Sequence, residues 1–304
     1  MSDDAVLAEI ITLVPELQRG EAAISPLGGG LTNRNYLIDC SGQRYVVRIS
    51  DNDSGLLAID RDHEHLNSRA AAEAGVGAEV IAYLPDLGAL AIGFIEGETQ
   101  SAERLRRGDR LAEVAAACRT LHEGPVFAGD FDMFAIQRRY RALVAERRFR
   151  LPGRYDAFEP KVREIEQAMA ARREPSRPCN NDLLAENFIW TGERFRLIDY
   201  EYSGQNDPMF ELGNVWSESN LTLDQLAELV THYYGRRRES RIARARLWGL
   251  MSKYGWTLWA SIQDAVSPID FDFWGWGMEK YERAVAEFDG PDLPRLLDQV
   301  QLSD

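Results

Sequence analysis

The sequence has no apolar run long enough to cross a membrane. The longest one, from Leu87 to Ile95, contains two glycines and is far shorter than the roughly 20 residues that a spanning helix needs. The first four residues, Met1 to Asp4, are acidic, whereas the start of a secretory signal is basic. We therefore expect a cytoplasmic protein without membrane insertion.

Cysteine is also scarce. Cys40, Cys118 and Cys179 are far apart, so the chain has neither the paired CxxC spacing of a zinc site nor the even count of a disulfide framework. Three isolated thiols are compatible with a reducing compartment. The pattern predicts no structural metal and no disulfide.

Basic residues are too few to balance the acidic ones. The 304 residues include 35 Lys and Arg against 49 Asp and Glu, a formal net charge of −14. Such a field opposes the phosphate backbone of nucleic acid and an anionic membrane surface. A small cationic molecule suits it better, so we expect a small-molecule substrate and no nucleic-acid partner. The sequence does not indicate the oligomeric state.

Strand-like and helical patterns separate along the chain. The first part carries strand-like runs around one helical segment, at 31–39, 43–50, 79–83 and 89–94, with the helix at 59–73 and its apolar stripe at Leu66, Ala70 and Ala74. The second part is mainly helical, at 102–122, 134–146, 158–173 and 247–266, with one small hairpin at 187–200. We predict an α+β protein with a β-rich lobe over 1–95, a helical lobe over 96–304 and a ligand cleft between them.

Two acids and one amide at particular spacings form the strongest motif. Asp182 is followed by Asn187 in the segment NDLLAEN, and Asp199 ends the apolar run Leu197-Ile198. A loop followed by a hairpin can bring Asn187 and Asp199 together as hard oxygen ligands for Mg²⁺, while Asp182 faces a nucleophile. Turn and cap residues could account for each position alone, but the joint spacing favours phosphoryl transfer.

A glycine-rich turn precedes the first strand-like run. It consists of Gly28, Gly29 and Gly30, followed by Thr32 and Asn33. Residues without a Cβ let backbone N–H groups approach phosphate oxygens, although a glycine turn that merely reverses the chain is more common.

A basic residue on the next strand strengthens the phosphate interpretation. Arg48 lies in the apolar run VVRI and therefore needs an anionic partner. Glu64 on the following helix is the preferred partner, and Glu73 is the rival.

These motifs resemble a known family. An Asp followed five residues later by Asn, and then by an Asp after apolar residues, is similar to the catalytic and metal loops of protein-kinase-like enzymes. The segments IDYEYSG at 198–204 and WTLWASIQ at 256–263 resemble the choline/ethanolamine kinases, in particular the bacterial choline kinase-like proteins of the aminoglycoside phosphotransferase superfamily. The resemblance implies a protein-kinase-like fold and an ATP- and Mg²⁺-dependent kinase, with adenine against the connector at 94–96. Those kinases also carry Arg at the position of Arg48.

The resemblance further implies an amino alcohol as substrate. A quaternary ammonium donates no hydrogen bond and is bound by aromatic faces and carboxylates. The residues that match the choline pocket are Glu218, Trp256, Trp259 and Trp276, with Phe271 as a further wall. A stripe of aromatic residues at helical spacing also suits plain core packing. Ethanolamine, thiamine, an aminoglycoside or a sugar remain alternative acceptors.

One position departs from the family pattern. The family has His two residues before the catalytic Asp, and this chain has Asn180. Asn180 could brace the catalytic loop through a different hydrogen bond or leave it looser, so a catalytically silent nucleotide- or amine-binding protein is a further alternative. The four histidines, including His122, lie outside the motifs, and we interpret them as surface or packing residues.

Overall fold

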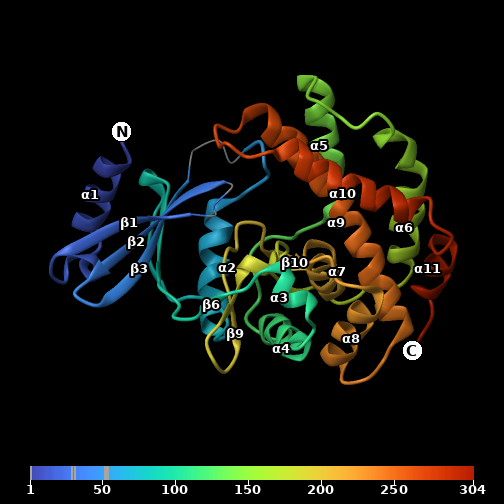
Figure 1. Cartoon of the computed structure of the whole chain (residues 1–304), viewed down its shortest axis with the longest axis horizontal. Coiled ribbons are helices and arrows are strands. Elements are labelled where there is room, and N and C mark those ends of the chain that lie inside the picture. The colour runs from blue at the N-terminus through green and yellow to red at the C-terminus, as the bar shows by residue number, and fades with distance from the viewer. Residues whose placement is uncertain (1, 29, 31, 51–54) are drawn as a thin grey trace.

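The small lobe is built on one antiparallel sheet. The computed structural model describes residues 2–28, 30, 32–50 and 55–304 (Figure 1). Five strands pair in the order β1-β2-β3-β5-β4. Their bounds are β1 Ala22–Leu27, β2 Asn33–Cys40, β3 Gln43–Ser50, β4 Val80–Leu84 and β5 Ala89–Gly93. Helix α1 (Asp3–Leu13) packs on this sheet, and α2 (Arg61–Glu73) lies between β3 and β4 in the chain.

The remainder of the chain is mostly helical. It contains α3 (Ala102–Arg106), α4 (Leu111–His122), α5 (Met133–Arg147), α6 (Glu159–Ala171), α7 (Pro208–Glu218), α8 (Leu223–Tyr234), α9 (Glu239–Val266), α10 (Phe273–Phe288) and α11 (Leu293–Gln299). Two small sheets accompany these helices: β6 (Glu98–Thr99) pairs with the hairpin of β8 (Phe188–Trp190) and β9 (Phe195–Leu197), and β7 (Arg177–Cys179) pairs with β10 (Gly204–Asn206). This arrangement confirms the predicted α+β fold with a β-rich lobe and a helical lobe.

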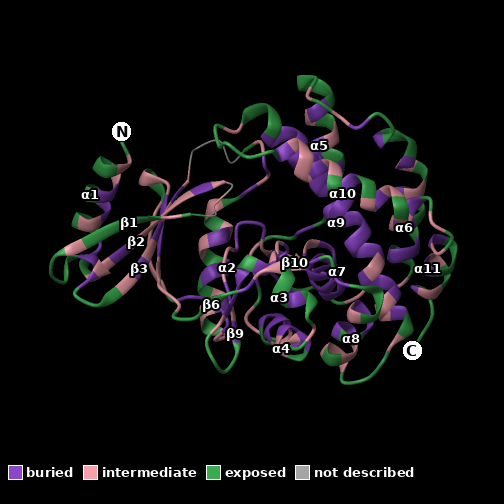
Figure 2. Cartoon of the chain, viewed as in Figure 1, coloured by how far each residue is buried: buried purple, intermediate pink, exposed green. Residues whose placement is uncertain are grey.

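Helix α9 is the centre of the larger lobe. Its residues from Leu247 to Gln263 are all buried, and α5, α7 and α10 pack around it (Figure 2). The crossing with α7 is close because Gly213 faces Gly249, and a Cβ added to Gly213 would lie 2.1 Å from the carbonyl oxygen of Ala245. This close packing fixes α7 and α9, which both carry predicted site residues.

The two lobes have separate hydrophobic cores. One core joins α1 to the five-stranded sheet, and the larger one fills the helical lobe. Helix α2 belongs to the larger core, since Ala71 is part of it together with Val76 after the helix. The lobe boundary between residues 95 and 96 stays a prediction.

Three local predictions were wrong or incomplete. The helix predicted over 102–122 is two helices, because the chain passes between them through Gly108 in the left-handed region at a φ of 78°. Strand β1 was not predicted; it is an edge strand, where Pro26 is tolerated. The stripe predicted on α2 is only partly correct: Ala70 and Ala74 pack against the large core, whereas Leu66 is 48% exposed.

No helix in the described part of the chain is both long enough and apolar enough to span a bilayer.

Candidate active site

The three predicted catalytic and metal residues come together from two loops: Asp182 and Asn187 lie in the segment between β7 and β8, and Asp199 lies shortly after β9. The side-chain amide of Asn187 donates to the carbonyl oxygen of Asp182 at 2.7 Å. The backbone N–H of Ile198 donates to the carbonyl oxygen of Asn187 at 3.1 Å, which places Asp199 next to Asn187. The amide nitrogen of Asn187 is thus engaged with the loop, and its oxygen is the atom left to act as a ligand. An amide oxygen beside a carboxylate is a donor set that suits Mg²⁺.

The backbone of the site adopts strained conformations. Asn181, directly before Asp182, has a φ of 68°, and Asp199 has a φ of 62°. Non-glycine residues rarely occupy this left-handed region, and such residues gather at functional sites where the surrounding structure holds them in place. Asn181 is held by its side-chain amide, which donates to the carbonyl oxygens of Cys179 and Tyr202.

Asn180 braces the catalytic loop against the metal loop. Its side-chain amide donates to the carbonyl oxygens of Ile198 at 3.1 Å and of Asp199 at 2.7 Å, and its side-chain oxygen accepts the backbone N–H of Asp182 at 3.1 Å. The side chain is completely buried. Of the two outcomes expected for this departure from the family pattern, the structure has the alternative hydrogen-bonded brace.

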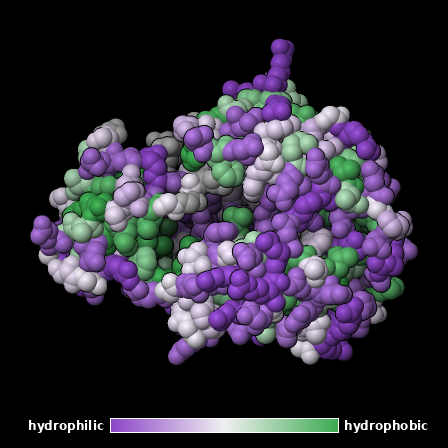
Figure 3. Space-filling model, in the orientation of Figure 1, coloured by the Kyte–Doolittle hydropathy of each residue, from purple (hydrophilic) through white to green (hydrophobic). Residues whose placement is uncertain are grey.

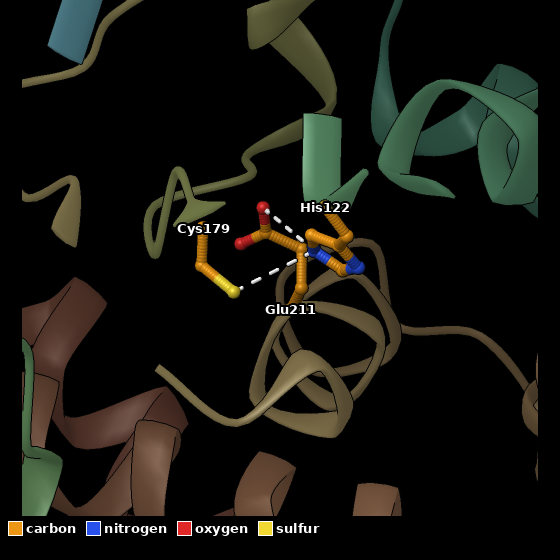
Figure 4. A group of neighbouring side chains, drawn as sticks. All are labelled: His122, Cys179 and Glu211. Atoms are coloured by element: carbon orange, nitrogen blue, oxygen red, sulfur yellow. Dashed lines mark hydrogen bonds and ion pairs between the residues drawn. The ribbon is translucent and has the colours of Figure 1, made fainter. Parts of the chain in front are cut away.

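A buried carboxylate beneath the loop was not predicted. Glu211 on α7 is fully buried, and its two oxygens accept the backbone N–H groups of Asn180 and Asn181, each at 2.8 Å. Cys179 and His122 of α4 lie beside it: Nε2 of His122 is 3.6 Å from the Glu211 carboxylate and 3.5 Å from the Cys179 sulfur (Figure 4). Such a trio can also hold a metal ion, but here both carboxylate oxygens are engaged by the catalytic loop. We interpret the cluster as a support for that loop.

His122 therefore has a more specific place than the sequence indicated. It is buried, and its Nδ1 lies 2.9 Å from the hydroxyl of Tyr233. Nothing in the sequence indicates that a histidine at the end of a helical pattern contacts a carboxylate about ninety residues away. The contact is visible only in the structure.

The predicted ion pair on the phosphate side is present. Arg48 on β3 pairs with Glu64 on α2, and the rival Glu73 ends that helix. A second terminal nitrogen of Arg48 lies 3.3 Å from a carboxylate oxygen of Asp199. The guanidinium thus bridges two carboxylates, which a lysine could not do with the same geometry.

Thr32 and Asn33 reach the larger lobe. Both donate to the carboxylate of Glu201, Thr32 at 2.9 Å and Asn33 at 2.9 Å. Arg61 lies 3.2 Å from the same carboxylate and 2.7 Å from that of Glu64. The structure therefore joins the end of the glycine-rich segment to the residues that follow Asp199.

The glycines themselves differ in their surroundings. A Cβ added to Gly28 would meet nothing within 4 Å, whereas one added to Gly30 would lie 2.5 Å from the carbonyl oxygen of Asn33. Gly29 lies outside the described residues. At Gly30 the missing Cβ is a steric requirement of the fold, and at Gly28 it leaves the backbone open to a ligand.

Asp182 and Asp199 both have a raised pKa. Burial at the floor of the site, followed by the negative charges of Asp199 and Glu218, raises the pKa of Asp182 well above its usual value, and Lys280 opposes the shift. Burial and the charge of Glu201 raise the pKa of Asp199 to about 6, against the effect of Arg48. A cation placed between these acids would favour their ionised forms.

The surface is hollowed between the lobes (Figure 3). A cavity of about 290 Å³ is lined by the start of α2, the loop at 129–132, the start of α5 and residues 201–203. Because Glu201 and Tyr202 belong to both this cavity and the metal loop, the cavity adjoins the site.

The three tryptophans among the predicted acceptor residues form one aromatic cluster. Tyr202 joins its members: its ring contacts that of Trp256 with centroids 4.9 Å apart, and its hydroxyl accepts the indole N–H of Trp259 at 2.9 Å. The ring of Trp276 lies 5.5 Å from that of Trp259. Phe271 is 40% exposed and reaches the cluster only through Phe273. Tyr202 belongs to the segment at 198–204, but nothing in the sequence indicates that it connects Trp256 to Trp259.

Two lysines that the sequence analysis did not single out complete this region. Lys280 on α10 pairs with Glu218, and its Nζ lies 4.0 Å from the centroid of the Trp276 ring. Lys253 on α9 places its Nζ 3.6 Å from the Trp216 ring, and burial lowers its pKa to about 7. The acceptor region therefore contains ammonium groups of its own.

The connector between the lobes carries Phe94 and Glu96. Arg44 stacks over the Phe94 ring at 4.3 Å and pairs with Glu96. Adenine binding against this connector stays a prediction.

Comparison with known proteins agrees with this geometry. The model of a phosphotransferase enzyme family matches residues 23–248. The crystal structure of a choline/ethanolamine kinase family protein from Mesorhizobium loti is 30% identical and superposes over the whole of both chains with a TM-score of 0.86. Protein LicA of Haemophilus influenzae is 29% identical over 250 residues, 78% of this chain and 72% of the relative. Mouse ethanolamine kinase 2 is 26% identical over 278 residues, 80% of this chain and 70% of the relative. The chain belongs to the phosphotransferase enzyme family and, within it, to the choline/ethanolamine kinases.

Proposed function

We propose that this protein transfers the γ-phosphoryl group of ATP to the hydroxyl of choline or ethanolamine, with Mg²⁺. The observation that carries the proposal is the position of Asp182. It lies between two candidate oxygen ligands, Asn187 and Asp199, and the buried carboxylate of Glu218, which Lys280 links to the aromatic cluster. The carboxylate of Asp182 would thus be next to both the phosphates and the amino alcohol.

Each residue has a role in this reaction. Asp182 accepts or orients the hydroxyl proton of the acceptor, a task helped by a raised pKa. Asn187 and Asp199 would hold the metal, which neutralises charge on the phosphates when it is bound. Arg48 would contact the phosphates from β3, and Glu64 keeps its guanidinium in place.

The nucleotide would enter under the glycine-rich segment. Gly28 leaves space for a phosphate, while Thr32 and Asn33 anchor the end of the segment on Glu201. Gly30 allows the tight turn between them. This arrangement supports a triphosphate held between β1, β2 and the metal loop.

The hydrogen bonds of Asn180 favour an active enzyme over a silent binding protein. The brace that a histidine supplies in the family is replaced by three hydrogen bonds of one buried amide. A fully bonded buried group keeps the loop in one geometry. The departure from the family pattern is therefore compensated locally.

The test is coupled ADP release with choline, ethanolamine, thiamine and kanamycin compared side by side. We expect stimulation by choline or ethanolamine, and a loss of about 100-fold or more in Asp182→Asn, since general-base catalysis contributes factors of this size. The exposed Glu186→Gln serves as a matched control in the same loop and should keep full turnover. Stimulation by thiamine or kanamycin alone would refute the choice of acceptor, and nucleotide binding without any turnover would refute the kinase.

A further inference from the structure

An ammonium group of the chain itself occupies the position expected for the ammonium of the substrate. Lys280 lies one helical turn after Trp276 on α10, so its side chain folds back over that ring. It also pairs with Glu218, and the two side chains are only 6% and 3% exposed. Trp276 and Glu218 are two of the residues expected to bind the cation of an amino alcohol.

This pairing changes what the pocket can offer. One oxygen of Glu218 is held by Lys280, while the other, Oε1, is buried and has no hydrogen-bond partner among the described residues. A buried carboxylate oxygen without a partner is costly, and a donor from a ligand would satisfy it. A primary ammonium has three N–H donors, whereas a trimethylammonium has none.

The basic groups around Glu218 also make the pocket less suitable for a trimethylammonium. Lys280 already neutralises the carboxylate, and Lys253 and Arg283 are two further basic groups close enough to affect its surroundings. A quaternary ammonium relies on net negative charge and free aromatic faces. Here Lys280 pairs with the carboxylate and covers one face of Trp276.

We infer that Lys280 determines acceptor specificity: it selects an alcohol with an N–H-bearing ammonium, such as ethanolamine, over a trimethylated one. The inference rests on the proposed function, because it assigns Glu218 and Trp276 to the acceptor. The selected ammonium shares Glu218 with Lys280 by donating to Oε1, and the trimethylated one meets a like charge without forming a hydrogen bond.

Cation binding tests the inference without any turnover. Methylammonium and tetramethylammonium are titrated into the full chain by calorimetry, in the wild type, in Lys280→Gln and in Lys280→Arg. Glutamine keeps an N–H donor toward Glu218 but removes the charge, and arginine keeps the charge. Melting curves show whether each variant folds.

We expect the wild type to bind methylammonium more tightly than tetramethylammonium. In Lys280→Gln the ratio of the two affinities should move toward tetramethylammonium by about 30-fold, the size of one cation–π interaction in a desolvated site, and in Lys280→Arg it should stay unchanged. Equal or tighter binding of tetramethylammonium by the wild type overturns the inference, even if the glutamine variant does not fold. An unchanged ratio in Lys280→Gln, or the same shift in Lys280→Arg, also overturns it.

Turnover separates this inference from the proposed function. If the wild type phosphorylates choline and ethanolamine and Lys280→Gln leaves their ratio of kcat/KM unchanged, the inference fails and the function stands. If neither alcohol is phosphorylated while the cation affinities shift as expected, the function fails and the role of Lys280 stands.

Discussion

Replacing Glu211 by glutamine measures how much one buried carboxylate holds the catalytic loop. The carboxylate accepts two backbone N–H groups at 2.8 Å and is completely buried. Glutamine has the same shape but only one acceptor oxygen, so its NH₂ group would face one of those N–H donors. A hydrogen bond to a charged group contributes about 1.5–3 kcal/mol, and leaving a buried donor unsatisfied costs about 1–3 kcal/mol, so we expect Glu211→Gln to lower the free energy of unfolding by about 3–5 kcal/mol.

Urea unfolding followed by tryptophan fluorescence gives this free energy. The control is Glu186→Gln, which makes the same chemical change at an exposed position of the same loop and should leave the midpoint unchanged. A loss of less than about 1 kcal/mol in Glu211→Gln would refute the reasoning, because it is below the contribution of one charged hydrogen bond. The loop would then be held mainly by its other contacts, such as the bond from Leu183 N–H to Asn214.

Three further outcomes are expected. Burial lowers the pKa of Lys253 to about 7 from 10.5, so above pH 7 the folded protein releases a proton that the unfolded chain keeps. Between pH 6 and 9 the free energy of unfolding of the wild type should therefore rise by about 2–3 kcal/mol relative to that of Lys253→Met. A difference between the two proteins that stays constant with pH in urea titrations would contradict this. Arg48→Lys should raise the KM for ATP by about tenfold, because a point charge cannot bridge both carboxylate partners, and a KM within twofold of the wild type would argue against the bridge. Gly213→Ala should lower the free energy of unfolding by about 3 kcal/mol, because the new Cβ would lie 2.1 Å from the Ala245 carbonyl oxygen. The control is Gly153→Ala, whose new Cβ meets nothing within 4 Å. Equal midpoints of urea unfolding for the two variants would contradict the prediction.

The proximity of the residues expected to handle phosphate could be predicted because their spacings in the chain are short. Asp182 and Asn187 lie in one loop, and Asp199 ends the neighbouring hairpin, so their proximity follows from local structure. Arg48 could be matched to Glu64 because a charge in an apolar strand needs a partner. The structure contains that ion pair.

Residues that depend on distant packing could not be found in this way. Glu211 lies in an apolar helix 31 positions after Asn180, and Lys280 lies 62 positions after Glu218. Nothing local marks either one as a partner. The inward face of α2 could not be predicted for a related reason: it carries the polar residues Glu64 and Asn67, whose partners lie far away in the chain, while the apolar Leu66 is exposed.

The contacts of Glu201 have a consequence for product release. This one carboxylate, 6% exposed, connects Thr32, Asn33 and Arg61 of the small lobe to the metal loop of the large one. Separating the small lobe from the metal loop must break these bonds and also the contact of Arg48 with Asp199. The rate of ADP escape would therefore depend on how long both sets of contacts last.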